Sequence, residues 1–375
     1  MKNKIYKYFF NEFIRYFSIT IFALAVIIWT VQSVNFLDLV TEDGHALGTY
    51  FSYSLLTISK ILTKLVPFSF FVAMIWTIVK FEKDNELIII WSSGLNKIYI
   101  VNLIFKISLL VTLIQLILTN IINPTLLLSS RILLKNSELK FIPSLLKEKQ
   151  FNDTVEGLTI FVESKDESNF YKNIFIRDDS KILSSIGNKS STIFSKSGYI
   201  DENNNLILFN GNIQKLNEDN TINVVKFKKT TLNLSGLSTK SISDPKMQET
   251  PTLAILECIK NKNINLKMHN CSPTKKSFAD TKIEINKRFG IPIFIPLLSL
   301  ICSFLLFSRR DKKIYKYNGY IYSFLCFSLL ATSEIMVRYS GISWTHTTLY
   351  YSFPLIMIPI IYFTLIRKFK YENLT

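Results

Sequence analysis

The stretch "YFSITIFALAVIIWTVQSVNFL", residues 16–37, decides the fold class because it contains no charged residue. At about 1.5 Å of rise per residue, a helix of this length reaches across a hydrocarbon layer of about 30 Å. A secretory signal peptide has a shorter core that ends at a small-residue cleavage site, whereas Ala23 and Ala25 lie in the middle of this run. The stretch therefore predicts a retained membrane-spanning helix.

Further apolar runs of similar length follow along the chain. The predicted spans cover residues 17–37, 55–79, 99–122, 289–308, 318–338 and 347–366. Each span must be helical, because an open strand in lipid would leave its backbone polar groups unsatisfied. The spans fall into two groups of three, separated by a long insert.

Basic residues explain the formal net charge of +16, because they cluster at the ends of the apolar runs. They lie before the first span, after the second, after the fourth and after the sixth. The connections 41–49 and 339–346 contain no Lys or Arg. By the positive-inside rule both termini are cytoplasmic, and the charge indicates membrane topology and not nucleic-acid binding.

The insert, residues 125–285, has the sequence pattern of a β domain and is predicted to lie on the outer side of the membrane. Short segments rich in β-branched and aromatic residues alternate with Gly, Asn, Asp and Ser. The segments are "LTIFVES" (158–164), "NIFIRD" (173–178), "STIFSK" (191–196), "NLILFNG" (205–211) and "INVVKFKK" (222–229). This spacing predicts an antiparallel sandwich or roll. The chain is thus an α+β integral membrane protein, divided into residues 1–124, 125–285 and 286–375.

Motifs for enzyme chemistry are missing from the sequence. There is no GxxxxGK[ST] phosphate loop, no HExxH or Cys/His metal spacing and no G-x-S-x-G elbow. We therefore predict no catalytic residue, no metal and no cofactor. Any energy from ATP must come from a separate subunit.

Ionisable residues near the outer ends of two spans form i,i+4 pairs, Lys60 with Lys64 and Glu334 with Arg338. One interpretation is that the lysines extend to the interface and that Glu334 pairs with Arg338 in its own helix. The other is a polar cavity facing the outer leaflet, where basic groups bind an anionic headgroup and the Glu334–Arg338 pair holds facing helices. Arg288, at the outer start of the fourth span, fits either this basic ring or an interface anchor.

The stretch "EKDNELIIIWSSGLNK", residues 82–97, is too short to span and predicts a cytoplasmic amphipathic helix over 84–94. Leu87, Ile90 and Trp91 share one face, Gly94 ends the helix, and Glu86 is an exposed carboxylate at its start. The helix either lies on the lipid surface or docks in a groove of a cytoplasmic partner.

These features resemble the LptF/LptG permeases, the membrane subunits of the ABC exporter that extracts lipopolysaccharide from the bacterial inner membrane. The resemblance covers nearly the whole chain and includes "YKYFFNEFIRYF" (6–17), "ELIIIWSSGLNK" (86–97), the strand segments and "IEINKRFGIP" (283–292). Glu12 resembles LptF more than LptG. The family's basic residues in the first span have no match here, where Gln32, Asn35 and Asp38 stand.

The resemblance implies a set of partners and site residues. The partners are a second permease, a cytoplasmic ABC ATPase dimer, a periplasmic bridge protein continuing from the β-jellyroll edge, a single-span bitopic subunit and lipopolysaccharide or a similar anionic glycolipid. Glu86 would be the ATPase-docking residue, with Gly94 as the helix stop. The candidates for headgroup binding are Lys60, Lys64, Arg288 and Arg338.

Other interpretations stay open at the level of the sequence. One is a membrane-anchored scaffold or receptor whose β domain binds a ligand without transport. Another is a lipid-modifying enzyme that uses Glu334 as a base. Cys258 and Cys271 are either a disulfide in an oxidising periplasm or free thiols, and the other two cysteines, Cys302 and Cys326, are predicted to be small apolar packing residues.

Overall fold

The computed structural model describes residues 2–41, 45–137, 146, 148–153, 157–166, 170–179, 190–201, 205–216, 221–233, 246–260, 275–307 and 315–372. The chain divides into two compact units. The membrane unit comprises Met1–Val31, Thr57–Leu128 and Lys246–Thr375, and the β unit comprises Gln32–Leu56 and Ser129–Pro245. The sequence-based division at residues 124 and 285 stays a prediction.

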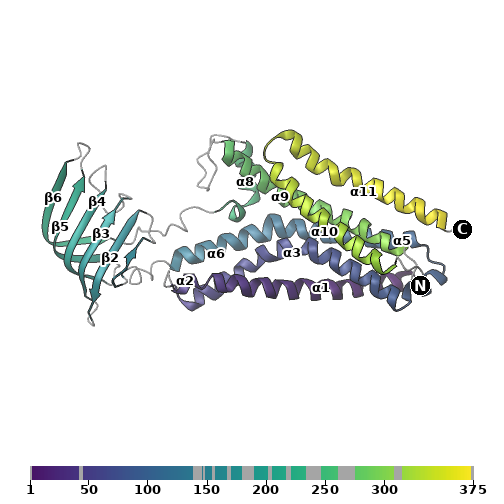
Figure 1. Cartoon of the computed structure of the whole chain (residues 1–375), viewed down its shortest axis with the longest axis horizontal. Helices are drawn as coiled ribbons and strands as arrows, with labels where there is room; N and C mark the ends of the chain where they lie inside the picture. Colours follow the sequence, from purple (N-terminus) through teal and green to yellow (C-terminus); the bar gives the residue numbers. More distant parts are fainter. Residues whose placement is uncertain are drawn as a thin grey trace. The chain divides into compact units, whose positions relative to one another are not determined.

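Among the described residues, six helices are long and apolar enough to cross a membrane, which confirms the six predicted spans (Figure 1). Each continues beyond its predicted range at one or both ends. The elements that form them are α1 (Lys2–Asn35) with α2 (Asp38–Thr41), α3 (Leu47–Lys83), α5 (Lys97–Ile117) with η1 (Leu118–Ile122) and α6 (Asn123–Ser137), α9 (Lys275–Ser303) with η4 (Phe304–Phe307), α10 (Tyr315–Tyr339) and α11 (Trp344–Glu372). Between α3 and α5 lies the short helix α4 (Glu86–Ser92).

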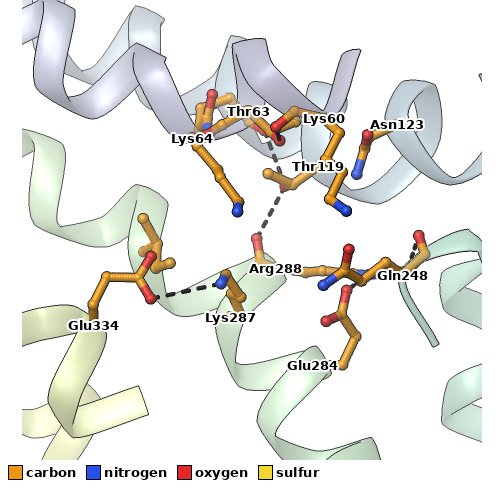
Figure 2. Close-up of a pocket in the computed structure, with 12 residues that line it drawn as sticks. Lys60, Thr63, Lys64, Thr119, Asn123, Gln248, Glu284, Lys287, Arg288 and Glu334 are labelled. Carbon is orange, nitrogen blue, oxygen red and sulfur yellow. Dashed lines mark hydrogen bonds and ion pairs between the residues drawn. The ribbon is translucent and has the colours of Figure 1, made fainter. Parts of the chain in front are cut away.

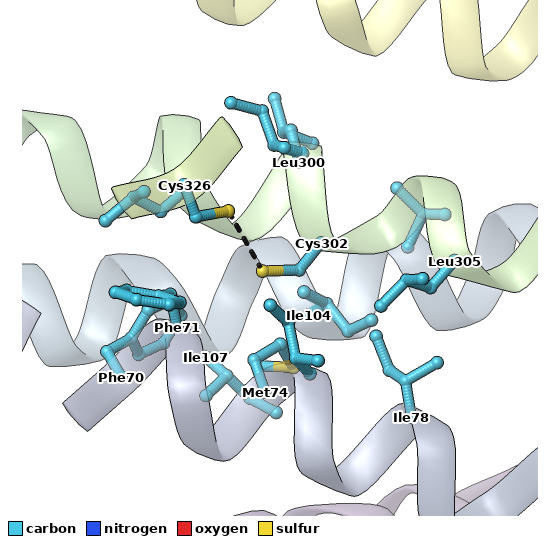
Figure 3. Close-up of a cluster of buried hydrophobic side chains, with 14 of the residues drawn as sticks. Phe70, Phe71, Met74, Ile78, Ile104, Ile107, Leu300, Cys302, Leu305 and Cys326 are labelled. Carbon is cyan, nitrogen blue, oxygen red and sulfur yellow. Dashed lines mark hydrogen bonds between the residues drawn. The ribbon is translucent and has the colours of Figure 1, made fainter. Parts of the chain in front are cut away.

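Helix α9 is the centre of the membrane unit, since it packs against α5, α10 and α11. In the most apolar 18-residue stretch of this span 78% is buried inside the chain, against 6% in the corresponding stretch of the first span. Figure 3 shows part of the core, where Phe70 and Met74 of α3 meet Ile104 of α5 and the two cysteines Cys302 and Cys326. The cysteine sulfurs are 3.7 Å apart and both residues are buried and free, which agrees with apolar packing. Helix α1 leaves most of its apolar surface uncovered.

The β unit contains one six-stranded antiparallel sheet in which every strand pairs with its neighbour in sequence. The strands are β1 (Phe151–Asn152), β2 (Leu158–Lys165), β3 (Tyr171–Asp178), β4 (Ser191–Ile200), β5 (Asn205–Leu216) and β6 (Ile222–Asn233). The five predicted strands are confirmed, and the sheet is curved (Figure 1). The described strands form this single curved sheet and not two facing sheets.

One face of the sheet carries the core of the β unit. Its buried residues include Ile160, Val162, Ile176 and Leu208. The alternation of buried and exposed residues shifts by one position at Asn173 and Asn210, which have φ values of 51° and 50° and lie at gaps in the strand pairing. Asn tolerates this left-handed backbone better than most residues, and the strand register is the same on both sides of each position.

The chain returns from the sheet through η3 (Met247–Glu249) and α8 (Thr252–Lys260), which belong to the membrane unit. Helix α8 agrees with the helical periodicity of "TPTLAILECIK" (250–260). Cys258 is buried in α8 and is disulfide-bonded, so the free-thiol alternative is wrong for this residue. Its predicted partner Cys271 lies outside the described residues.

Candidate functional site

A polar cavity of about 70 Å³ lies in the membrane unit (Figure 2). Its lining comes from α3, α5, η1, α6, η3, α9 and α10 and consists of Lys60, Thr63, Lys64, Gln115, Thr119, Asn123, Gln248, Glu284, Lys287, Arg288, Ile291 and Glu334. The cavity brings together four residues singled out from the sequence: Lys60, Lys64, Arg288 and Glu334. A water needs about 10–15 Å³ of such volume, so the space holds a few waters or one small anionic group.

A proline in α3 creates one wall of this cavity. Pro67 has no N–H, so the carbonyl of Thr63 lacks its helical donor. Gln115 of α5 supplies the missing donor, with its Nε2 at 2.6 Å from the Thr63 oxygen. The Gln115 Oε1 atom is buried and has no hydrogen-bond partner among the described residues. This acceptor is left for a donor inside the cavity.

Two prolines in α9 also free carbonyls, and side chains of α5 and η1 donate to these oxygens. Pro292 leaves the Arg288 carbonyl without its helical donor, and Thr119 Oγ1 donates to that oxygen at 3.0 Å. Pro296 does the same to the Pro292 carbonyl, which accepts from Thr112 Oγ1 at 3.4 Å. Polar side chains of α5 and η1 therefore hold α9 in place, at carbonyls that prolines have freed.

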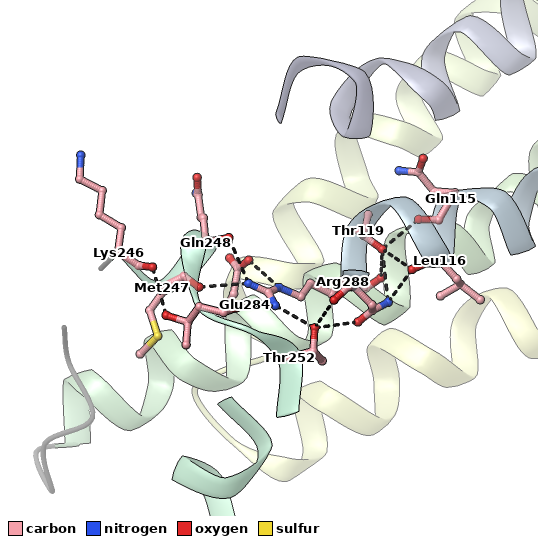
Figure 4. Close-up of polar contacts among 11 residues, drawn as sticks. Gln115, Leu116, Thr119, Lys246, Met247, Gln248, Thr252, Glu284 and Arg288 are labelled. Atoms are coloured by element: carbon pink, nitrogen blue, oxygen red, sulfur yellow. Dashed lines mark hydrogen bonds and ion pairs between the residues drawn. The ribbon is translucent and has the colours of Figure 1, made fainter. Parts of the chain in front are cut away.

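Arg288 uses its guanidinium to hold the returning chain (Figure 4). Its Nε donates to Glu284 Oε1 at 3.0 Å, and its two other nitrogens donate to the Thr252 hydroxyl and to backbone carbonyls of residues 247, 248 and 250, at 2.8–3.2 Å. The residue is 3% exposed. Arg288 was predicted to bind a lipid headgroup. In this structure its guanidinium has no free donor for a ligand, because Glu284 balances its charge and residues of η3 and the start of α8 accept its other hydrogen bonds.

The two lysines of α3 differ from Arg288. Lys60 is half-buried and Lys64 is exposed. Neither forms an ion pair with any residue that the structure describes. Their ammonium groups are the cations of the cavity that remain available for a ligand.

Glu334 of α10 forms an ion pair with Lys287 of α9, with 3.5 Å between nitrogen and oxygen. The ion pair therefore joins α10 to the helix beside it, and the Glu334–Arg338 pair stays a prediction. Arg338 is exposed and does not line the cavity. Glu334 thus does hold facing helices together, but through a residue that the sequence analysis missed.

Helix α4 presents a different face from the one predicted. Leu87 and Ile90 are buried in the core of the membrane unit, and Trp91 is half-buried against it. The exposed apolar residues are Ile88 and Ile89, at 61% and 65%. Leu87 and Ile90 are therefore not available as anchors for a partner in this structure.

The end of α4 agrees with the predicted stop, whereas Glu86 at its start, predicted to be exposed, is partly buried. Gly94 has a φ of 81°, a left-handed backbone that suits glycine after a helix. Glu86 Oε1 accepts a hydrogen bond of 3.0 Å from the hydroxyl of Tyr8 in α1, whereas Glu86 Oε2 is buried and has no partner among the described residues. A second contact, 2.8 Å between Lys80 and Glu12, ties α3 to α1 nearby.

Several of these residues were missed from the sequence, although a signal exists for them. Thr112, Gln115 and Thr119 repeat at helical spacing in an otherwise apolar span, and prolines lie four residues after the carbonyls that these side chains bind. Tyr8 and Lys287 carry no such signal. Among the described residues, no group of His, Cys, Asp and Glu side chains is arranged to hold a metal ion.

Comparison with known proteins identifies the family of this chain. The sequence matches the family described as "Lipopolysaccharide export system permease LptF/LptG" over residues 7–368. It is also 24% identical, over 225 residues, to the uncharacterized protein RP871 of Rickettsia prowazekii (strain Madrid E). That match covers 57% of this chain and 61% of the relative, so the chain spans about three fifths of the relative's length. Because the family match extends over nearly every residue, the chain belongs to the LptF/LptG family.

Proposed function

We propose that the chain is a permease subunit of an ABC exporter that extracts lipopolysaccharide, or a similar anionic glycolipid, from the bacterial inner membrane. Both termini would lie in the cytoplasm. The observation that carries the proposal is α4, a short helix between two spans with an unpartnered Glu86 oxygen beside two exposed isoleucines. An unsatisfied buried acceptor costs about 1–3 kcal/mol, so a basic side chain of an ATPase that approaches the partly exposed side of Glu86 and reaches this oxygen would bind it favourably.

Helix α3 would connect the energy input to the cavity. It runs without interruption from the region of Lys60 and Lys64 through Pro67 to Lys83, and α4 begins three residues later. Movement of α4 by a cytoplasmic ATPase dimer would therefore be transmitted along one helix. Pro67 removes a helical hydrogen bond and gives the helix a natural bending point.

Lys60 and Lys64 support an anionic substrate, because two ammonium groups without ion-pair partners favour phosphate binding. The cavity of about 70 Å³ is smaller than a glycolipid headgroup. It would have to widen as the permease moves, and it accepts one phosphate group first. The chain itself would supply no catalysis and need no cofactor.

The surfaces left uncovered support further subunits. The apolar α1 offers a face to a second permease. Strand β6 ends the sheet, and no described strand pairs with its outer edge. An edge strand of twelve residues is a site for strand addition, so the periplasmic bridge protein and a single-span bitopic subunit would continue the sheet there. The apolar core face would shield acyl chains.

Isolation of the membrane complex tests the proposal. We expect the wild-type chain and Asp84→Lys to co-purify with a stoichiometric cytoplasmic ATPase and to release glycolipid when ATP is added. We expect Glu86→Lys to lose both. If the wild-type chain carries no ATPase, it is a membrane-anchored scaffold or receptor. If Glu334→Gln abolishes a chemical change of the lipid while the complex stays intact, it is a lipid-modifying enzyme.

A further inference from the structure

The β unit has a groove lined mainly by side chains on the face of the sheet opposite to its apolar core. This groove has a volume of about 700 Å³. Phe161, Phe175 and Phe194 lie side by side across β2, β3 and β4, because the strand register pairs each with the next. The same register continues to Asn212 on β5 and Lys226 on β6. All five residues therefore share one face.

The phenylalanine rings make an aromatic floor for the groove. The ring centroids of Phe175 and Phe194 are 5.1 Å apart, and those of Phe161 and Phe151 on β1 are 4.7 Å apart. Phe194 is 42% exposed. Phe161 and Phe175 are partly exposed. A row of adjoining rings that solvent reaches is unusual on a monomeric surface and indicates a binding site. Rings of this kind offer flat apolar faces to a ligand.

Polar groups surround the aromatic floor. Asn173 and Asn210, the two residues with a left-handed backbone in these strands, lie on its border. The Oδ1 atom of Asn212 is buried in the lining and has no hydrogen-bond partner among the described residues. Lys196 and Lys226 border the groove, are exposed and form no ion pair with a described residue. The groove therefore offers an acceptor that needs a donor and two cations that need an anion.

We propose that this groove binds a phosphorylated saccharide. The C–H faces of a sugar ring fit the phenylalanine floor, its hydroxyl groups donate to Asn212 Oδ1, and its phosphate contacts Lys196 and Lys226. A fatty acyl chain would leave Asn212 and both lysines unsatisfied. The inference rests on the proposed function, since the saccharide would be the sugar part of the same glycolipid whose acyl chains contact the opposite face.

Binding to the intact membrane complex, without ATP, tests the groove. The probe is the fluorescein-labelled oligosaccharide obtained from lipopolysaccharide by complete deacylation, measured by fluorescence polarisation. We expect saturable binding that the Lys196→Gln/Lys226→Gln double variant weakens about tenfold and Asn212→Ala weakens by a smaller factor. Lys172→Gln removes a charge from the same sheet outside the groove and should leave binding unchanged.

Four results would overturn the inference. The first two are a wild-type complex that shows no saturable binding and a double variant that binds as tightly as the wild type. The other two come from competition: inorganic phosphate displaces the probe as well as the unlabelled oligosaccharide does, or dodecanoate or an acidic peptide displaces it better than the dephosphorylated oligosaccharide does. Because no ATP is present, loss of ATPase coupling in Glu86→Lys leaves this measurement unaffected. The inference and the proposed function therefore fail separately.

Discussion

Arg288 in the cavity of the membrane unit and Glu86 in helix α4 differ in whether the chain itself supplies all their hydrogen-bond partners. Arg288 has its hydrogen bonds filled by the chain, and carbonyls freed by prolines in α3 and α9 accept from side chains of α5 and η1. At α4, one oxygen of Glu86 is left without a partner and two isoleucines face outward. We infer from this difference that the cavity wall around Arg288 forms within one chain, and we propose that another protein completes α4.

Among the replacements that test this comparison, that of Arg288 should have the largest effect, a loss of stability. Arg288→Gln leaves Glu284 without its cation and three backbone carbonyls without their donor in a buried place. Removal of one partner from a buried ion pair costs about 3–5 kcal/mol. We expect a marked fall in the thermal unfolding temperature of the purified chain. Lys287→Gln, in a half-exposed pair with Glu334, should cost less than about 1 kcal/mol, and equal losses would contradict a preformed cavity.

Replacement of the two lysines should change ligand binding and leave stability unaltered. The Lys60→Gln/Lys64→Gln variant removes the cations that have no ion-pair partner in the cavity. We expect the affinity for an anionic glycolipid in detergent to fall about tenfold or more, with the same unfolding temperature. The control is Lys260→Gln, an exposed lysine in the last turn of α8. Equal affinity in the double variant and the control would show that the lysines only extend to the interface.

Tyr8→Phe should have the smallest effect of these replacements, a change in the affinity of the ATPase for the permease. It removes one hydrogen bond of 3.0 Å to Glu86 and leaves the aromatic contact with Phe81 in place. One such bond contributes about 0.5–1.5 kcal/mol, which corresponds to a two- to tenfold change in the affinity of the ATPase for the permease. Titration of the ATPase against the reconstituted permease measures this change. Unchanged affinity would mean that α1 does not orient the carboxylate.

The spans and strands could be predicted because long uncharged runs and β-branched segments follow directly from burial in lipid or in a sheet. The meeting of Lys60, Lys64 and Glu334 at one cavity also follows from their similar depth in the membrane. Periodicity could not say which face of α4 is covered. It shows that Leu87 and Ile90 share a side, but the helices that cover this side are distant in sequence.

The role of Arg288 could not be predicted for a similar reason. A cation near the end of a span fits a lipid phosphate or a buried clamp equally well, and only the position of η3 and the start of α8 decides between them. In the sheet, Asn173 and Asn210 look like ordinary strand residues. Their left-handed backbone, which shifts the alternation, depends on the neighbouring strands.

Photo-crosslinking from α4 in native membranes tests the central claim most directly. A photoreactive amino acid at position 89, where the side chain is exposed, should form a covalent adduct with a cytoplasmic ATPase, and the same amino acid at the buried position 90 should not. Adducts with lipid alone at position 89 would contradict the claim that a partner protein completes this helix. Equal ATPase adducts at both positions would contradict the assignment of its faces.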